Sequence, residues 1–329
     1  MRRTWAPFAT ILAFALVISG CGDDSEGGSS SPDKVTYVTA FGAVGRDAFA
    51  WVAQEKGYFR EAGLDVTIQL GAATGENLKV LAAGQAQFAH VDLTGAWILA
   101  GKGESKDVRA IAAVHQQSLV SIVALEGSGI TQPKQVEGRK IGAATGSVNQ
   151  LLFPGYAKLA GIDPAKVQWF NAQPAQLPTL LASGRVDALS TFLIGVKGIE
   201  KAAGGKKATV LPYNKYLPEM FGNGILAPVS ITRDRPDLAR RFRDAALKGL
   251  QYTLDHPEEA AQILKKAQPA ADVTAAVGEI TLMAPYVKTS GVIDRARVAG
   301  AIATLERGGL IPPGLTPDSV VDFNLAPTG

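Results

Sequence analysis

Apolar residues recur at helical spacing at the start of the stretch 49–70. Phe49, Val52 and Ala53 fall on one face of a short helix, and polar residues separate this face from Gly57. Gly57 is expected to end the helix, because glycine adopts the positive φ of a helix C-terminus without steric cost. Residues 64–68 then alternate between apolar and polar side chains, which predicts a β-strand. The pattern predicts a helix, an aromatic pair folded back on it, and a strand.

The same alternation of strands and helices continues along most of the chain. Strands are expected at 35–39, 64–68, 88–91, 108–114, 138–143, 167–170 and 186–189. Helices are expected at 77–83, 94–101, 148–160, 177–183, 236–254 and 257–267, with further amphipathic helix up to residue 310. Strands that alternate with helices favour a mostly parallel, doubly wound sheet.

A short phrase repeats in the two halves of this pattern. Leu-Ala-x-Gly followed by a buried strand occurs at 81–89 and again at 181–188. The repeat suits two lobes of similar winding, joined by two crossings of the chain. The predicted boundaries are 34–120 for the first part of lobe 1, 121–212 for lobe 2, and 213–329 for the return to lobe 1 with the C-terminal helices.

The first 20 residues have the pattern of a secretory signal. Arg2 and Arg3 precede an apolar run at 5–18, and small residues lead into Cys21. Ile-Ser-Gly-Cys resembles a bacterial lipobox, in which the cysteine is lipidated; an ordinary secretory signal with an incidental cysteine is the alternative. Residues 21–33 are small and polar and are expected to form a flexible tether. The pattern predicts a protein anchored by lipid to the extracytoplasmic face of the cell membrane.

Composition and charge exclude several classes of function. The chain has 33 basic and 30 acidic residues, and without Arg2 and Arg3 the balance is 31 against 30. No basic stripe is present, so nucleic-acid binding is not expected. Cys21 is the one cysteine, which excludes an internal disulfide and any multi-cysteine metal site. No metal site and no cofactor are predicted, because His90 and His115 have no spacing that demands a shared ligand.

Four short segments resemble a known family. They are AQEKGYF at 53–59, GLDV at 63–66, AAGQ at 82–85 and ASGRVDA at 182–188. These segments are similar to the SsuA/THI5-like, or NMT1-like, solute-binding proteins of ABC importers for sulfonates, nitrate and thiamine-pyrimidine precursors. The resemblance implies an α/β, bilobed type II periplasmic-binding fold, with two doubly wound domains and a ligand cleft between them. It also implies a monomeric, non-enzymatic receptor that docks on the permease and ATPase subunits of an importer.

Candidate ligand contacts follow the ends of the predicted strands, where α/β sheets place their ligands. Arg46 is suited to a carboxylate or sulfonate and Asp47 to a ligand amino group. Phe41 and Phe192 are candidates for stacking on a flat ligand. Thr145 or Ser147 is expected to cap the helix that follows, and both are candidates for ligand contact. The full predicted set is Phe41, Arg46, Asp47, Thr74, His90, Asp92, Gln116, Thr145, Ser147 and Phe192.

The identity of the ligand stays open at this point. The aromatic residues and Asp47 favour a flat, nitrogen-containing compound similar to the pyrimidine of thiamine, and sulfonate, taurine or nitrate anions are the alternative. A distant alternative is an enzyme similar to the thiamine-pyrimidine synthases of the family, which carry a cysteine-rich motif. No nucleophile elbow, paired-histidine metal motif or P-loop occurs in the sequence.

Overall fold

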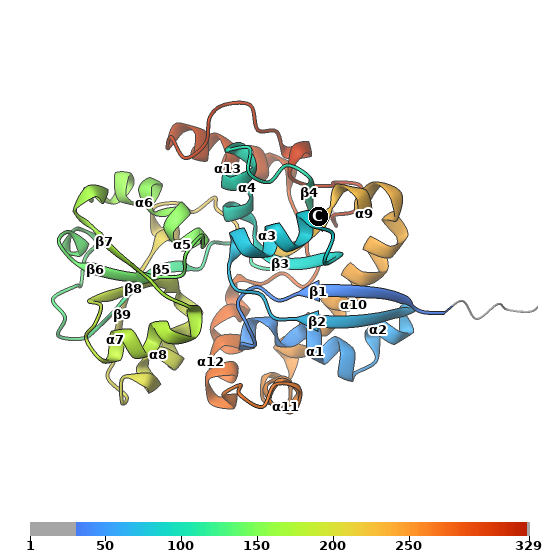
Figure 1. Ribbon diagram of the computed structural model, residues 1–329, viewed down its shortest axis with the longest axis horizontal. Helices are drawn as coiled ribbons and strands as arrows, with labels where there is room; N and C mark the ends of the chain where they lie inside the picture. Colours follow the sequence, from blue (N-terminus) through green and yellow to red (C-terminus); the bar gives the residue numbers. More distant parts are fainter. Residues whose placement is uncertain (1–30, 328–329) are drawn as a thin grey trace, which may run out of the picture. The chain divides into compact units, whose positions relative to one another are not determined.

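The computed structural model describes residues 31–327. The predicted signal at 1–20 and the predicted lipidation site Cys21 lie outside the described residues. The elements that follow are labelled in Figure 1. Among the described helices, none combines the length and apolarity needed to cross a membrane.

The first sheet holds the first four strands and the last one. Its order is β2-β1-β3-β10-β4, and β1 pairs in parallel with both β2 and β3. β10 runs antiparallel to β3 and β4. The strands are β1 (Asp33–Val38), β2 (Leu64–Gln69), β3 (Phe88–Asp92), β4 (Val108–Ala113) and β10 (Asn223–Pro228).

The second sheet repeats this arrangement with the middle strands of the chain. Its order is β7-β6-β8-β5-β9, with β6 parallel to β7 and β8 and with β5 antiparallel to β8 and β9. The strands are β5 (Val120–Leu125), β6 (Lys140–Ala143), β7 (Gln168–Asn171), β8 (Ala188–Phe192) and β9 (Ala208–Pro212). The predicted bilobed, doubly wound α/β fold is confirmed. Each sheet also contains one antiparallel strand, which the sequence pattern did not predict.

The chain passes between the sheets twice. It leaves the first sheet after β4, enters the second at β5, and returns between β9 and β10. We call the residues at 31–113 and 223–327 lobe 1, and those at 120–212 lobe 2. The predicted boundaries at residues 120 and 212 stay predictions.

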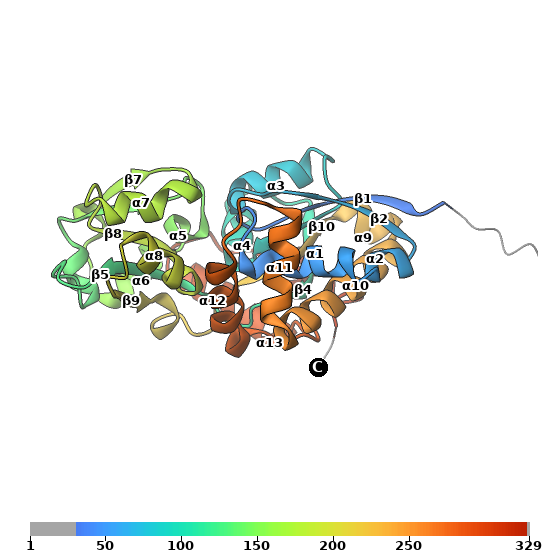
Figure 2. The ribbon, with the colours of Figure 1, turned by 90° about the horizontal axis from the view of Figure 1, so that it is seen from below.

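Helices surround both sheets (Figures 1 and 2). Those of lobe 1 are α1 (Ala48–Glu55), α2 (Tyr58–Glu61), α3 (Thr74–Ala82), α4 (Leu93–Gly101), α9 (Val229–Asp234), α10 (Pro236–Asp255), α11 (Pro257–Ala267), α12 (Val273–Met283) and α13 (Arg295–Arg307). Those of lobe 2 are α5 (Val148–Leu151), α6 (Phe153–Ala160), α7 (Leu177–Ala182) and α8 (Val196–Ala202). Two 3₁₀ turns, η1 (Gly45–Asp47) and η5 (Leu193–Gly195), precede α1 and α8.

The stretch 49–70, predicted as a helix, an aromatic pair and a strand, packs into the core of lobe 1. Gly57 and Gly63 take φ values of 77° and 69°, as a left-handed turn requires. The turn brings Phe59 onto Phe242 of α10, with ring centroids 5.4 Å apart and planes within 9°. Phe88 of β3 stacks on the same Phe242 at 4.0 Å. These buried stacks join α2, α10 and the first sheet in one apolar core.

Several predicted elements have other bounds or divisions in the structure. The helix expected at 148–160 is divided into α5 and α6, because Pro154 has no N–H to continue the α5 hydrogen bonds and starts α6 instead. The helix expected from residue 77 begins at Thr74, three residues earlier. β8 begins at Ala188 and ends at Phe192, so Phe192 belongs to the strand itself.

Candidate ligand-binding site between the lobes

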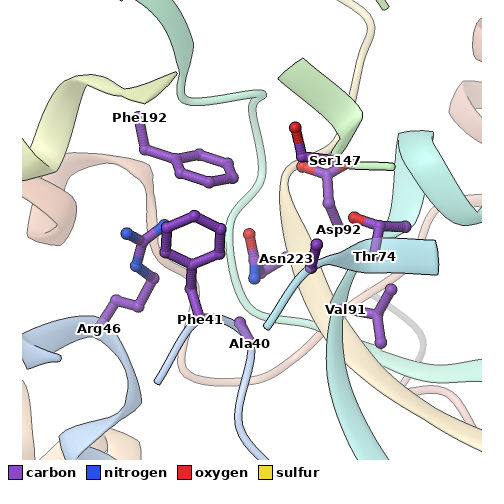
Figure 3. Close-up of a pocket in the computed structure, with 10 residues that line it drawn as sticks. Ala40, Phe41, Arg46, Thr74, Val91, Asp92, Ser147, Phe192 and Asn223 are labelled. Carbon is purple, nitrogen blue, oxygen red and sulfur yellow. The ribbon is translucent and has the colours of Figure 1, made fainter. Parts of the chain in front are cut away.

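A small cavity lies where the two lobes meet, and Figure 3 shows the residues around it. Its volume is about 10 Å³, close to the smallest space that holds one water molecule. We call it the inner cavity. Most of its residues sit at or just beyond the carboxyl ends of parallel strands, as expected for α/β sheets. It is lined by Ala40, Phe41, Arg46, Ala73, Thr74, Val91, Asp92 and Asn223 of lobe 1 and by Ser147 and Phe192 of lobe 2.

The lobes are in direct contact beside this cavity. Gly75 N–H at the start of α3 donates to Gly146 O at 3.2 Å. Gly95 of α4 lies so close to lobe 2 that an added Cβ would stand 2.9 Å from Cβ of Val148. In this arrangement the two lobes leave room for about one water molecule between them at this point.

Arg46 is buried in η1 and its guanidinium packs against two aromatic rings. Its Cζ is 4.4 Å from the centroid of Phe192 and 5.6 Å from that of Phe41. The two rings are 5.8 Å apart at an interplanar angle of 78°. Nη2 faces Glu279 at 3.6 Å, whereas Nε and Nη1 have no hydrogen-bond partner. The site therefore contains a buried cation with free donors.

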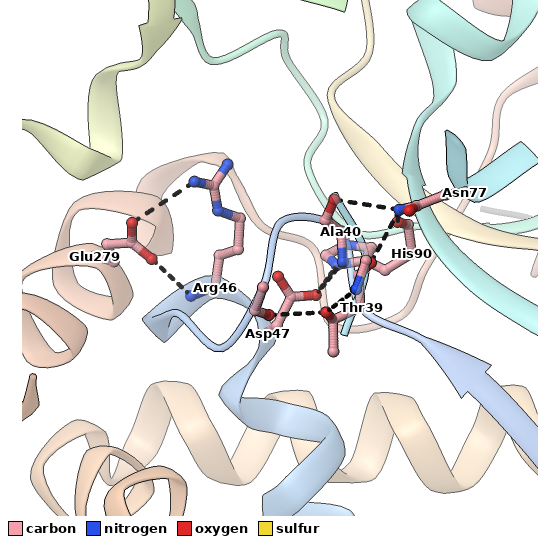
Figure 4. Close-up of polar contacts among 9 residues, drawn as sticks. Thr39, Ala40, Arg46, Asp47, Asn77, His90 and Glu279 are labelled. Atoms are coloured by element: carbon pink, nitrogen blue, oxygen red, sulfur yellow. Dashed lines mark hydrogen bonds and ion pairs between the residues drawn. The ribbon is translucent and has the colours of Figure 1, made fainter. Parts of the chain in front are cut away.

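Glu279 of α12, which is not among the predicted ligand contacts, holds Arg46 in place. One carboxylate oxygen accepts from the Arg46 backbone N–H at 3.1 Å, and the other faces the guanidinium (Figure 4). Burial raises the pKa of Glu279, and the charge of Arg46 opposes that rise. Gly45 permits this close packing, since an added Cβ would stand 2.3 Å from Ala276 O of α12.

Asp92 is the buried carboxyl group of the inner cavity. It ends β3 and caps α4, where its Oδ1 accepts from Gly95 N–H at 2.9 Å. Its Oδ2 is buried without a partner. Burial raises the pKa of Asp92 to about 7, although hydrogen bonds from the α4 N-terminus and the charge of Arg46 act in the opposite direction. Near neutral pH this carboxyl group can accept or donate a hydrogen bond.

Ser147 brings a hydroxyl group from lobe 2, and the expected capping role is wrong. It occupies the N-cap position of α5, but its side chain makes no capping hydrogen bond and its buried Oγ has no partner. Thr145, on the same turn, is exposed and does not line the cavity. Thr74 is buried at the start of α3 and lines the cavity from lobe 1.

Asp47 and His90 form a support beneath the inner cavity and do not line it. Oδ1 of Asp47 accepts from Ala40 N–H at 2.9 Å and lies 2.8 Å from His90 Nδ1. Both side chains are fully buried. Asn77 adds a second support, since its amide donates to Thr39 O and Ala40 O (Figure 4). These bonds hold the loop that carries Phe41 and Arg46.

Gln116 lies away from the inner cavity. Its amide nitrogen donates to Ala113 O and Val292 O, and its Oε1 accepts from Arg297 at 3.2 Å. Gln116 thus ties the crossing after β4 to the C-terminal part of lobe 1. The predicted contacts that do line the cavity are Phe41, Arg46, Thr74, Asp92, Ser147 and Phe192. Their contact with a ligand stays a prediction.

Sequence reasoning missed Asn223 and Glu279. Asn223 begins β10, directly after the second crossing, and Glu279 lies in a helix whose pattern is that of an ordinary buried face. No local motif marks either residue. Within residues 31–327, no cluster of three or more His, Cys, Asp or Glu side chains is placed to hold a metal ion.

Comparison with known proteins identifies the family. Residues 47–260 match the sequence profile described as "NMT1/THI5 like". The chain belongs to the NMT1/THI5-like family. This confirms the resemblance seen in the sequence.

Two curated relatives show the range of activities among similar proteins. The formylaminopyrimidine-binding protein of Halalkalibacterium halodurans is 24% identical over 266 residues, which cover 80% of this chain and 79% of the relative. The 4-amino-5-hydroxymethyl-2-methylpyrimidine phosphate synthase of Legionella pneumophila is 23% identical over 231 residues, 66% of this chain and 68% of the relative.

A solved structure supports the fold. The alkanesulfonate-binding protein SsuA of Xanthomonas axonopodis pv. citri, bound to MOPS, superposes with a TM-score of 0.71 at 13% identity. The match covers 89% of this NMT1/THI5-like chain and 99% of the other. At this identity the comparison establishes the bilobed fold and nothing about the ligand.

Proposed function

We propose that this protein is the extracytoplasmic solute-binding receptor of an ABC importer, which closes its two lobes on a small ligand. One observation carries the proposal. Arg46 and Asp92 from lobe 1 and Ser147 from lobe 2 are each at most 3% exposed, have polar atoms without partners, and line one cavity. Buried polar groups normally have hydrogen-bond partners, so three unpartnered groups at one point indicate a site for a polar ligand.

The favoured ligand is a flat nitrogenous compound of the aminopyrimidine class. A carboxyl group with a pKa of about 7, as for Asp92, can pair with the amino group and a ring nitrogen of an aminopyrimidine through two hydrogen bonds. Phe41 and Phe192 provide aromatic walls from the two lobes. The relative that binds formylaminopyrimidine supports this class.

A sulfonate or similar anion is the second candidate, and Arg46 favours it. The free Nε and Nη1 donors lie on a guanidinium, the group best suited to bidentate recognition of sulfonate oxygens. Asp92 opposes it, because a carboxylate beside an anion is unfavourable unless the carboxyl group is protonated.

A binding panel separates the two candidates. The purified protein is heated with aminopyrimidines, alkyl sulfonates, taurine or nitrate, each at saturating concentration. A ligand at 100 times its dissociation constant stabilises the protein by about 2.7 kcal/mol. We expect stabilisation by an aminopyrimidine that is lost in Asp92→Ala. Stabilisation only by anions, lost in Arg46→Ala, would establish the second candidate, and no stabilisation by any compound would contradict the proposal.

We also propose that the protein is not an enzyme. The Legionella relative is named a synthase, so the question requires a direct test. A bound aminopyrimidine is incubated with the protein, released by denaturation and analysed by mass spectrometry. A receptor returns the compound unchanged. A change in its mass that depends on the protein would contradict the proposal.

The proposed partners are a permease and an ATPase, and the proposed attachment is a lipid on Cys21. Labelling of cells with a fatty acid tests the anchor, because the label should be incorporated in the native protein and absent in Cys21→Ser. Equal labelling of both proteins would contradict lipidation at this residue.

A further inference from the structure

The two crossings between the lobes run side by side. The first crossing is residues 114–119, and the second is residues 213–222. Gly222 N–H donates to His115 O at 3.1 Å. The two segments are so close here that an added Cβ on Gly222 would stand 2.8 Å from Cβ of His115. A rotation of one lobe on the other must therefore bend both segments together.

The segment that leads from α12 to α13 holds the lobe 1 end of the first crossing. Gln116 N–H donates to Tyr286 O at 2.7 Å, and its side-chain amide donates to Val292 O at 3.1 Å. His115 pairs with Val287 in an antiparallel bridge. The start of the first crossing is therefore bound to the C-terminal part of lobe 1 by backbone and side-chain bonds.

Arg297 extends this attachment to the second crossing. It lies in the first turn of α13, where Asp294 caps the helix by accepting from Arg297 N–H at 2.7 Å. Helical side chains lean towards the N-terminus of their helix, which directs the guanidinium back to the crossings. Nη1 donates to Gln116 Oε1 at 3.2 Å, and Nη2 donates to Gln116 O. Cζ lies 3.9 Å from the ring centroid of Phe221. One half-buried guanidinium therefore contacts both crossings.

Phe221 connects this contact to the helix that begins at the inner cavity. Its buried ring packs against Arg297 and, at a centroid distance of 5.5 Å, against Trp97 of α4. Its backbone O accepts from Thr94 Oγ1 at 2.8 Å. Thr94 lies two residues after Asp92, whose carboxyl group lines the inner cavity. The lobe 1 end of the second crossing is therefore attached to α4.

The opposite ends of the crossings are bound to lobe 2. Leu119 O accepts from Leu193 N–H at 2.9 Å. Tyr213 Oη shares a buried hydrogen bond of 3.0 Å with Ser190 Oγ of β8. Only the residues between these bonds and the Arg297 contacts can bend without breaking them.

We propose that Arg297 is a hinge brace, which fixes the lobe 1 ends of both crossings and confines the bending to residues 117–118 and 214–220. Arg297 acts through Gln116 and Phe221 and does not line the inner cavity, so it is a positioning residue. The inference rests on the proposed function in one respect, because a receptor that closes on its ligand needs such a hinge.

Distances between the lobes test the brace without any ligand. Cys21 is the one cysteine, so Cys21→Ser gives a chain in which two new cysteines can be labelled selectively. Thr67→Cys in lobe 1 and Ser183→Cys in lobe 2 are conservative changes at exposed positions. Double electron–electron resonance between spin labels at these positions measures the distribution of interlobe distances. Arg297→Met keeps an apolar stem against the Phe221 ring but loses the bonds to Gln116, and it should broaden this distribution.

Arg295→Met is the matched control. Arg295 lies in the same turn of α13, pairs with Asp318 and has its Cζ 4.0 Å from the Phe323 ring centroid, but it contacts neither crossing. It should keep the native width. Equal broadening by Arg295→Met and Arg297→Met would assign the effect to the charge of the helix and overturn the brace.

Arg297→Lys is a milder variant, which keeps the charge but not the planar fork that contacts both crossings. It should give a width between those of the native protein and Arg297→Met. A native width in both variants of Arg297 would overturn the inference.

Hydrogen exchange locates the bend. Val114 and His115 N–H groups both donate to Asn223 O at 2.9 Å on the lobe 1 side of the brace, whereas Ser118 lies within the proposed bend. In the native protein, Ser118 N–H should exchange faster than the other two. Arg297→Met should raise the exchange rates of Val114 and His115 by about fivefold, the lower end of typical coupling between sites. Equal rates at all three positions in the native protein would overturn the proposed position of the bend.

The labelled native protein also separates this inference from the proposed function. A compound of the binding panel that binds should shorten the mean interlobe distance. Binding without any change in distance would contradict closure of the lobes on a ligand. The brace would still be decided by the comparison of native protein, Arg297→Met and Arg295→Met without ligand.

Discussion

The two sides of the inner cavity are built differently. On the lobe 1 side, Arg46 is held by Glu279, and the loop that carries it is held by Asp47 and His90. On the lobe 2 side, Ser147 makes no side-chain hydrogen bond, and Phe192 contacts the Phe41 ring and the Arg46 guanidinium. The lobe 1 side is therefore held by hydrogen bonds within its own lobe, whereas the lobe 2 side presents a hydroxyl group without a partner and an aromatic ring.

This difference divides the effects of substitutions into two kinds. Changes in the support of lobe 1 should lower the free energy of unfolding, because they leave buried polar groups unpaired. Changes on the lobe 2 side should reduce ligand affinity with little effect on unfolding. The four predictions below test this division, from the largest expected effect to the smallest.

Asp47→Ala should lower the free energy of unfolding by about 3–5 kcal/mol, because it leaves two buried groups without a hydrogen-bond partner, at roughly 1–3 kcal/mol each. The substitution removes the partner of His90 and of Ala40 N–H. Urea denaturation monitored by circular dichroism measures the loss. Asp237→Ala is the control, because its carboxylate is exposed and pairs with Arg241 at the surface. A loss below about 1 kcal/mol, as expected for such surface pairs, would contradict the supporting role of Asp47.

Asp92 should make the folded protein less stable as pH rises. Its pKa is raised to about 7 in the folded state, so the folded protein holds this proton more tightly than the unfolded chain does. Its contribution is complete below the unfolded pKa of about 4 and is lost as pH increases to about 7. The loss can reach about 4 kcal/mol.

Asp92→Asn isolates this effect, because an amide does not titrate. Urea denaturation between pH 4.5 and 7.5, a window of roughly three pH units around the shift, should show a shallower fall in the variant. Burial also lowers the pKa of His115 and raises that of Glu279, but both groups are present in the two proteins. If the free energy of unfolding falls equally with pH in the native protein and the variant, the pKa of Asp92 is not raised in the folded state.

The contact between Arg46 and Phe192 should contribute about 1 kcal/mol, the usual size of a partly desolvated cation–π interaction. It joins the organised side of the site to lobe 2, with Cζ 4.4 Å from the ring centroid. A double-mutant cycle with Arg46→Met and Phe192→Leu measures the coupling energy between the two side chains. The cycle subtracts the apolar packing that each single substitution loses. A coupling energy near zero would mean that this contact does not stabilise lobe closure.

Ser147→Ala should change the free energy of unfolding by less than about 0.5 kcal/mol, because the hydroxyl group has no partner to lose. Affinity for the bound compound should fall about fivefold, the value of one hydrogen bond. Calorimetry and urea denaturation measure the two quantities. Thr145→Ala, on the same turn but exposed, should change neither. If Thr145→Ala lowers affinity more than Ser147→Ala does, the ligand contact belongs to Thr145 and not to Ser147.

Much of the fold could be predicted because its signals are local. Apolar alternation marked β2 and β3 to within a residue or two, and Gly57 and Gly63 take the positive φ values that their positions required. α11 has the predicted bounds because Pro257 starts it and charged residues separate its apolar face. The prediction of one helix at 148–160 did not take account of Pro154, although proline is itself a local signal that a new helix begins.

The candidate site was predicted only in part. Residues at the carboxyl ends of strands, such as Arg46 and Asp92, were found because topology alone directs these positions to a cleft. The direction of each side chain was not predictable. His90 and Asp92 are both in β3, yet His90 points to Asp47 beneath the site and Asp92 lines the cavity.

By itself, the sequence determined the winding of the two lobes, the family, and most of the strands that carry the site, since these depend on local periodicity and short motifs. Only the tertiary structure decided which residues share the cleft. Glu279 reaches Arg46 across 233 positions of sequence, and the inner cavity exists only where the two lobes meet. Such contacts depend on how elements far apart in the sequence pack against one another, and no local pattern of apolar and polar residues specifies that packing.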